Sequence, residues 1–224
     1  SIQNPLGSQT AVQMELNVKQ SGISQRILST FFGKTRSGKI LKRVHEKYLR
    51  NDIACCLDSC QKCLYLKSSG LTDLDEPISS TVPENHAVIV DSTTIIRFHH
   101  LLSDERFRNI IVMQTVWDNV KKSNPLVYKA LYSLCYESKI KRFVVFMDDF
   151  HKDTHVSDVP GEPKEQRLER CLLRCASYYD SHWKGYNIKI IIMCANDAER
   201  DRLNVDFANT YSIKDYVKGM QDNP

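Results

Sequence analysis

Four short, mostly apolar runs, separated by stretches with helical periodicity, constrain the fold of this 224-residue chain more than any other feature. The runs span residues 87–90, 110–113, 143–147 and 188–193, and β-branched and aromatic residues dominate them. Runs of this length and composition are typical of strands that are buried on both faces. They alternate with helix-like segments at 115–123, 126–138, 165–182, 198–205 and 213–220. The alternation predicts an α/β domain of three α/β/α layers, with a mainly parallel central sheet joined by right-handed crossovers.

The N-terminal part differs in composition and predicts a separate organisation. Residues 1–25 are polar and without periodicity, which indicates a flexible lead-in. A basic, cysteine-bearing extension is expected over 26–82, and residues 67–86 resemble an exposed connection into the α/β domain, which we expect over 83–224. Within the extension, apolar residues recur at helical spacing between Lys39 and Arg50, so a short amphipathic helix is expected there.

The extension is also strongly basic, because eight Lys and Arg residues lie between Arg26 and Arg50 against Glu46 alone. Such a patch suits phosphate backbones or an acidic partner surface, and its plain alternative is a solvated helix face without a partner. The eight cysteines are uneven, with four of them within residues 55–63, which favours reduced thiols and one metal site over a secreted disulfide scaffold. No stretch approaches the roughly 18 apolar residues of a membrane span, so no membrane association is expected.

Acidic residues follow the apolar runs where a parallel sheet places its functional edge. Asp91 ends the first run, Asp197 follows the fourth, and Asp118 and Glu169 lie early in the helix-like segments behind the same edge. Gathered carboxylates repel one another unless cations neutralise them, and oxygen ligands select hard ions such as Mg²⁺ or Mn²⁺. Such ions can activate water against a phosphodiester. The alternative is that acids after strands are ordinary loop residues and N-caps. Asp148 and Asp149, after the third run, are reserve candidates for which that alternative is favoured.

From residue 32 onward the chain resembles the PIN-domain portion of the catalytic, RNase II-type subunit of the eukaryotic RNA exosome. The stretches that carry the resemblance are 44–53 (VHEKYLRNDI) with the adjoining cysteines, 112–116 (VMQTV), Gly161-Glu162 and 167–170 (RLER). In that family four acids hold divalent metal and the domain cuts single-stranded RNA internally. The resemblance implies a Mn²⁺- or Mg²⁺-dependent endoribonuclease with these roles on Asp91, Asp118, Glu169 and Asp197.

Departures from the family pattern accompany the resemblance. Asp118 stands where the family usually has Glu, Glu169 where it has Asp, and the family's Asp-Thr-Asn is here Asp91-Ser92-Thr93. Each acid swap moves the carboxylate by one methylene, so the metal geometry or the activity is expected to change.

A second metal site is expected on the cysteines. Cys55, Cys60 and Cys63 have the spacing Cys-x4-Cys-x2-Cys, which supplies three of the four ligands that structural zinc requires. The resemblance implies His182, late in the main helix of the domain, as the fourth ligand. Cys56, His45 and His86 are alternatives, as is a set of buried thiols without metal.

The resemblance also implies the setting of this activity: single-stranded RNA as substrate, docking to exosome core subunits for RNA processing and decay, and location in the nucleus and nucleolus, with the cytoplasm as a second site. The resembled subunit carries further domains, so the chain is expected to be a fragment. Two other functions stay open. One is a noncatalytic exosome-tethering module with a degenerate site, and the other is a DNA-directed flap nuclease of similar fold.

Overall fold

A computed structural model describes residues 12–14, 22–63, 65–66, 86–138 and 142–221. Its centre is a five-stranded sheet in which every neighbouring pair is parallel, in the order β6-β5-β4-β7-β8. The strands are β4 (His86–Val90), β5 (Ile110–Met113), β6 (Phe143–Phe146), β7 (Lys189–Cys194) and β8 (Thr210–Ser212). All of β4 and β5 is buried, as continuous apolar strands in a covered sheet must be. The predicted fold class is confirmed.

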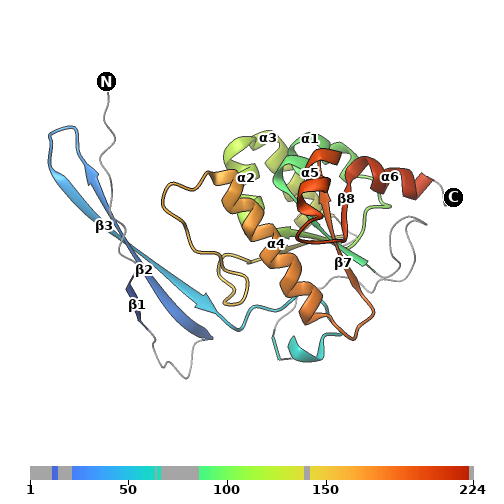
Figure 1. Cartoon of the computed structure of the whole chain (residues 1–224), viewed down its shortest axis with the longest axis horizontal. Helices are drawn as coiled ribbons and strands as arrows, with labels where there is room; N and C mark the ends of the chain where they lie inside the picture. The colour runs from blue at the N-terminus through green and yellow to red at the C-terminus, as the bar shows by residue number, and fades with distance from the viewer. Residues whose placement is uncertain (1–11, 15–21, 64, 67–85, 139–141, 222–224) are drawn as a thin grey trace.

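Helices cover the sheet and connect its strands (Figure 1). They are α1 (Ser92–Leu102), α2 (Gln114–Ser123), α3 (Pro125–Tyr132), α4 (Lys164–His182), α5 (Asp197–Leu203) and α6 (Ile213–Gln221). Helix α1 packs against α2 and α3, and α4 packs against β7 and α2. None of the helices in the described part of the chain has the length and apolar character needed to cross a bilayer.

The predicted helix at 39–50 is wrong, because these residues form strand β3 (Ile40–Arg50). It pairs antiparallel with β2 (Ile23–Lys34), and the short β1 (Val12–Met14), within the expected lead-in, pairs with β2. A turn at 35–39 closes the hairpin, with Gly38 at φ +83° and the amide of Thr35 donating to the Lys39 carbonyl. Ile40, Val44 and Tyr48 share one face of a strand as well as one side of a helix, so their spacing does not decide between the two, and the long partner strand does.

Three further elements were not predicted as they occur. Helix α1 is rich in β-branched residues at its start, which conceals its helical character, and β8 has only three residues. The segment expected as one helix over 126–138 is α3 followed by a turn of π-helix over Ser133–Glu137.

The hairpin is tied to the α/β domain at its base. The Lys47 Nζ atom lies 2.5 Å from Asp149 Oδ2, and the Arg50 backbone exchanges hydrogen bonds with Phe150 and Lys152. Most of the connection expected at 67–86, with the domain boundary placed in it, lies outside the described residues. The three-part domain division therefore stays a prediction.

Candidate active site and metal cluster

Asp91 lies at the carboxyl end of β4 and is the N-cap of α1. Its two carboxylate oxygens accept hydrogen bonds from the amides of Thr93 (3.2 Å) and Thr94 (3.0 Å). The capping role considered from sequence is therefore present. The cap does not use all of the acceptor capacity of the carboxylate, because each oxygen can still accept another hydrogen bond or bind a metal ion.

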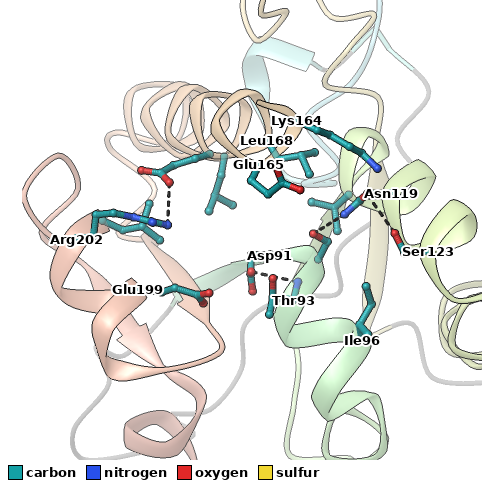
Figure 2. A pocket seen from close by; sticks show the side chains of 15 residues that line it. Asp91, Thr93, Ile96, Asn119, Ser123, Lys164, Glu165, Leu168, Glu199 and Arg202 are labelled. Carbon is teal, nitrogen blue, oxygen red and sulfur yellow. Dashed lines mark hydrogen bonds and ion pairs between the residues drawn. The ribbon is translucent and has the colours of Figure 1, made fainter. Parts of the chain in front are cut away.

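A cavity of about 380 Å³ opens above Asp91 between α1, α2, α4 and α5. Four carboxylates contribute to its lining: Asp91, Glu165, Glu169 and Glu199. Figure 2 shows Asp91 at the floor, Glu199 beside it, and Glu165 and Lys164 on the α4 side.

Within the described part of the chain, no cation of the protein pairs with the acids on the floor of this cavity. Asp91 has no ion pair with Lys, Arg or His among the described residues. Burial raises the pKa of Asp91; the hydrogen bonds from Thr94 lower it, and the charge of Glu199 raises it further. A buried carboxylate next to a second one is electrostatically unfavourable until a proton or a cation joins them.

Glu169, on α4, is the second predicted acid that lines this cavity. Its Oε2 atom lies 2.8 Å from an Arg202 guanidinium nitrogen of α5. Figure 2 shows this ion pair spanning the side of the cavity opposite Asn119. A cation of the protein thus already neutralises one of the carboxylates.

Asp118 lies outside the Asp91 cavity. It is exposed and lines a smaller, adjoining hollow with Lys122, Lys164 and Arg167. Its neighbour Asn119 lines both this hollow and the Asp91 cavity, and the Asn119 Nδ2 atom donates to Ser92 Oγ at 2.8 Å. One residue turns a helix by about 100°, so sequence position alone could not tell which of the two side chains faces the site.

Asp197 does not line that cavity either. It is the first residue of α5, its side chain is 49% exposed, and its Oδ1 atom lies 3.1 Å from Arg200. Glu199, two residues later, lines the cavity and accepts a hydrogen bond from the Ala195 amide (3.2 Å). Sequence analysis missed Glu199, although it shares the same helix start after β7.

The reserve acids Asp148 and Asp149 have structural roles. Asp148 is buried and accepts hydrogen bonds from the amide and hydroxyl of Thr115, so it holds the start of α2; burial raises the pKa of Asp148 to about 6. Asp149 lies between Lys47, His155 and Arg167. The preference for structural roles at these two positions agrees with these contacts.

The cysteine cluster is assembled as the spacing and the resemblance together predicted. Ligand atoms of Cys55, Cys60, Cys63 and His182 all lie within 4.8 Å of one another, and this is the one such group of His, Cys, Asp and Glu within the described residues. The His182 Nε2 atom is 3.3 Å from Cys60 Sγ and 3.4 Å from Cys63 Sγ. Zinc bonds of about 2.0–2.3 Å in tetrahedral geometry place ligand atoms about 3.5–3.8 Å apart. The cluster can therefore hold one metal ion.

The surroundings of this cluster also fit a metal. The Trp183 indole N–H donates to Cys55 Sγ at 3.2 Å, and the Tyr178 ring stacks on His182 with centroids 5.0 Å apart. Outer contacts of this kind fix the orientation of ligands. The alternative ligands lie elsewhere: His45 packs edge-on against Phe31, and His86 is hydrogen-bonded to Tyr216. Cys56 is not one of the four.

No protein-family model matches the chain. The relatives found by sequence comparison nevertheless agree with one another. The chain is 37% identical over 209 residues to a probable exosome complex exonuclease RRP44 of Caenorhabditis elegans, covering 93% of this chain and 22% of that protein. It is 28% identical to human RRP44 (87% and 21%) and 32% identical to dis3 of Schizosaccharomyces pombe (86% and 20%). The chain thus spans about a fifth of the length of these relatives.

One solved structure agrees with the fold. The T. brucei RRP44 PIN domain superposes with a TM-score of 0.61 at 23% identity, covering 78% of this chain and 94% of that one.

Proposed function

Because this chain belongs to the family of the RRP44 and Dis3 exosome exonucleases and has the fold of the RRP44 PIN domain, we propose that it is a divalent-metal-dependent endoribonuclease acting in an exosome. The observation that carries the proposal is Asp91, a half-buried carboxylate at the floor of the cavity, beside Glu199, that no cation of the described residues neutralises. The donors around it are oxygens, which is the ligand type that Mg²⁺ and Mn²⁺ prefer.

In this proposal Asp91, Glu169 and Glu199 would hold the metal. Asp197 remains a candidate ligand, because its ion pair with Arg200 is exposed and weak and would yield to a divalent ion. Asp118 is the least suited of the predicted acids, since Asn119 takes its place at the cavity.

The metal, when bound, supplies a hydroxide from water and stabilises the charge that develops on the phosphate. The chain's own residues position the substrate. Lys164 lies at the rim and can neutralise a phosphate next to the scissile one, and the Asn119 amide can donate to a phosphate oxygen. The cap hydrogen bonds from Thr93 and Thr94 hold the Asp91 carboxylate in a fixed orientation.

Cleavage of a circular single-stranded RNA tests the proposal, because a circle has no end for an exonuclease. The wild-type chain should linearise it with added Mn²⁺ and not without it, and Asp91→Asn should reduce the rate by at least about 100-fold. Asp104→Asn, which changes an exposed acid paired with Arg106, is the matched control and should cleave normally. Equal cleavage by Asp91→Asn would refute the site, and faster cleavage of matched DNA would indicate a flap-type nuclease instead.

A second candidate, a noncatalytic exosome-tethering module, is favoured by two observations. On α2, the side chain of Asn119, an amide and not a carboxylate, faces the cavity. Glu169 is already paired with Arg202. If no Mn²⁺-dependent cleavage occurs while the chain still binds exosome core subunits, this second function holds.

We propose the β2–β3 hairpin as the surface that docks to the exosome core. It exposes Phe32 (62%), Ile40 (73%) and Val44 (52%) among the basic residues of its tip. The side chains of Phe32 and Val44 lie on one face, because directly paired residues share a face and Val44 is two residues from Lys42, the partner of Phe32. An exposed apolar patch of this kind marks an interaction site. Phe32→Asp with Val44→Asp should abolish capture of purified exosome core, whereas Val205→Asp, at an even more exposed valine of the α/β domain, should not.

We propose that the cysteine cluster holds structural zinc. Its ligands come from the extension and from the end of α4, so the ion would join the two parts of the chain. The site has four protein ligands and leaves no open position for substrate, as is typical of structural zinc.

A further inference from the structure

Helices α2 and α3 and the following π-helical turn form an exposed surface that carries four aromatic rings. These rings belong to neither metal site, and the packing of the core does not account for their exposure. Trp117 lies at the centre of the surface, with Tyr128 and Tyr136 edge-on to it at 5.2 and 5.7 Å between centroids. Tyr132 lies 5.0 Å from Tyr136, with the two rings tilted by 37°. We call these four residues the aromatic surface.

The outer rings of the aromatic surface are available to a ligand. Tyr132 is 43% exposed and Tyr136 is 59% exposed, while Trp117 is half-buried beneath them. Tyr136 belongs to the π-helical turn Ser133–Glu137. Such turns are rare and occur frequently at functional sites.

The charge around these rings is positive. Between Asn119 and Tyr136 the sequence contains Lys121, Lys122 and Lys129 and no Asp or Glu. All three lysines are exposed, and Lys121 Nζ lies 5.3 Å from the centroid of the Tyr128 ring. The flanking acids are Asp118 and Glu137, and Glu137 accepts a hydrogen bond from Ser133.

The same helix connects this surface to the Asp91 cavity. At about 100° per residue, the exposed side of α2 runs from Asn119 through Lys122, Asp118 and Lys121 to Trp117. Asn119 lines the Asp91 cavity, and Lys122 lines the adjoining hollow with Lys164, which reaches both. Lys121, Lys122 and Lys164 therefore lie between the rings and the carboxylates, and Asp118 is the one acid of α2 among them.

We propose that the aromatic surface binds single-stranded RNA, with bases stacking on Tyr132 and Tyr136 and phosphates contacting Lys121, Lys122 and Lys129, and that it delivers the strand to the Asp91 cavity. Exposed rings with lysines between them are the arrangement that holds single strands without sequence preference, because every base has a face that stacks. A protein partner is less well matched, since stacking rings beside exposed lysines suit planar bases and phosphates. The delivery step rests on the proposed nuclease function, whereas the binding step does not.

The test is the affinity of a labelled single-stranded oligouridine, measured by fluorescence anisotropy without added Mn²⁺ or Mg²⁺, so that no cleavage occurs and the proposed zinc stays bound. Tyr132→Ala with Tyr136→Ala should weaken binding by at least about tenfold, and Tyr132→Phe with Tyr136→Phe should bind like wild type because the rings remain. Tyr65→Ala, which removes a 95% exposed ring outside this surface, is the control and should have no effect. Thermal unfolding of each variant shows whether it is folded.

The outcomes separate this inference from the proposed function. Asp91→Asn should bind the oligouridine at least as well as wild type, so loss of cleavage alone leaves the aromatic surface intact. Unchanged affinity in the folded double alanine variant would overturn the inference. So would an equal loss in the phenylalanine variant, or a loss of exosome core binding with RNA binding unchanged, which would make the occupant a protein.

Discussion

Replacing His182 with alanine removes the ligand that α4 contributes to the cysteine cluster and should release the proposed zinc ion. The His182 Nε2 atom lies 3.3 and 3.4 Å from two cysteine sulfurs, so its loss leaves three thiolates and an open position. A metal present at about a thousand times its dissociation constant stabilises the folded state by about 4 kcal/mol. For a domain of this size, 1 kcal/mol corresponds to about 2–4 °C in Tm, so we expect Tm to fall by roughly 8–16 °C.

Most of this loss should come from the metal and little from the side chain itself. The ring is half-buried and stacks on Tyr178, a contact worth about 1 kcal/mol. Wild-type protein treated with a strong zinc chelator should therefore unfold close to the Tm of untreated His182→Ala, and the chelator should barely shift the variant.

The assay combines thermal unfolding with zinc content by elemental analysis. Cys56→Ser is the matched control, because Cys56 is a buried neighbour in the same segment that lies outside the cluster, and it should retain one zinc per chain. If His182→Ala retains a full equivalent of zinc and shows the wild-type chelator shift, His182 is not a ligand. Wild-type protein purified without chelator and without zinc would refute the site itself.

Two further predictions concern charge. The pKa of Asp149 is well below its usual range: burial raises it, but the hydrogen bonds and charges of His155, Lys47 and Arg167 lower it more. A depressed folded-state pKa gives stability that is present above the ordinary value of 3.8 and is lost as pH falls below it. Asp149→Asn should therefore lower the free energy of unfolding by about 1–3 kcal/mol near pH 7. In urea titrations, the difference in this free energy from wild type should shrink below about pH 4. A difference that does not change with pH would contradict this. Arg202→Gln should free Glu169 and strengthen Mn²⁺ binding by up to about fivefold in calorimetry, and weaker binding would show that Arg202 supports the site.

The central sheet could be predicted because its strands are buried on both faces and therefore apolar almost throughout. The composition of a run such as 110–113 is enough to predict a buried strand, and the strand found there has those bounds. The hairpin could not be predicted in this way. Residues 40–50 do not form a buried sheet face that could be recognised from their own composition. Their structure depends on pairing with β2, which is distant in the sequence.

The site shows the same division between local and long-range information. The spacing of Cys55, Cys60 and Cys63 indicated a metal cluster locally, but His182, more than a hundred residues away, came only from the resemblance. Asp91 was recognisable because it ends a buried strand. The rotation of α2 about its own axis places Asn119 and not Asp118 at the Asp91 cavity. This rotation depends on how the helix packs, and the spacing of residues in the sequence does not determine it. The contribution of Glu199 likewise depends on the short helix α5.

The most direct test of the nuclease proposal is anomalous diffraction from a crystal soaked in Mn²⁺. We expect a peak about 2–2.2 Å from an Asp91 carboxylate oxygen, shared with Glu199 or Glu169. Saturating Mn²⁺ that produces no peak at Asp91, in crystals of protein that is otherwise intact, would contradict the claim that this cavity is a metal-dependent active site.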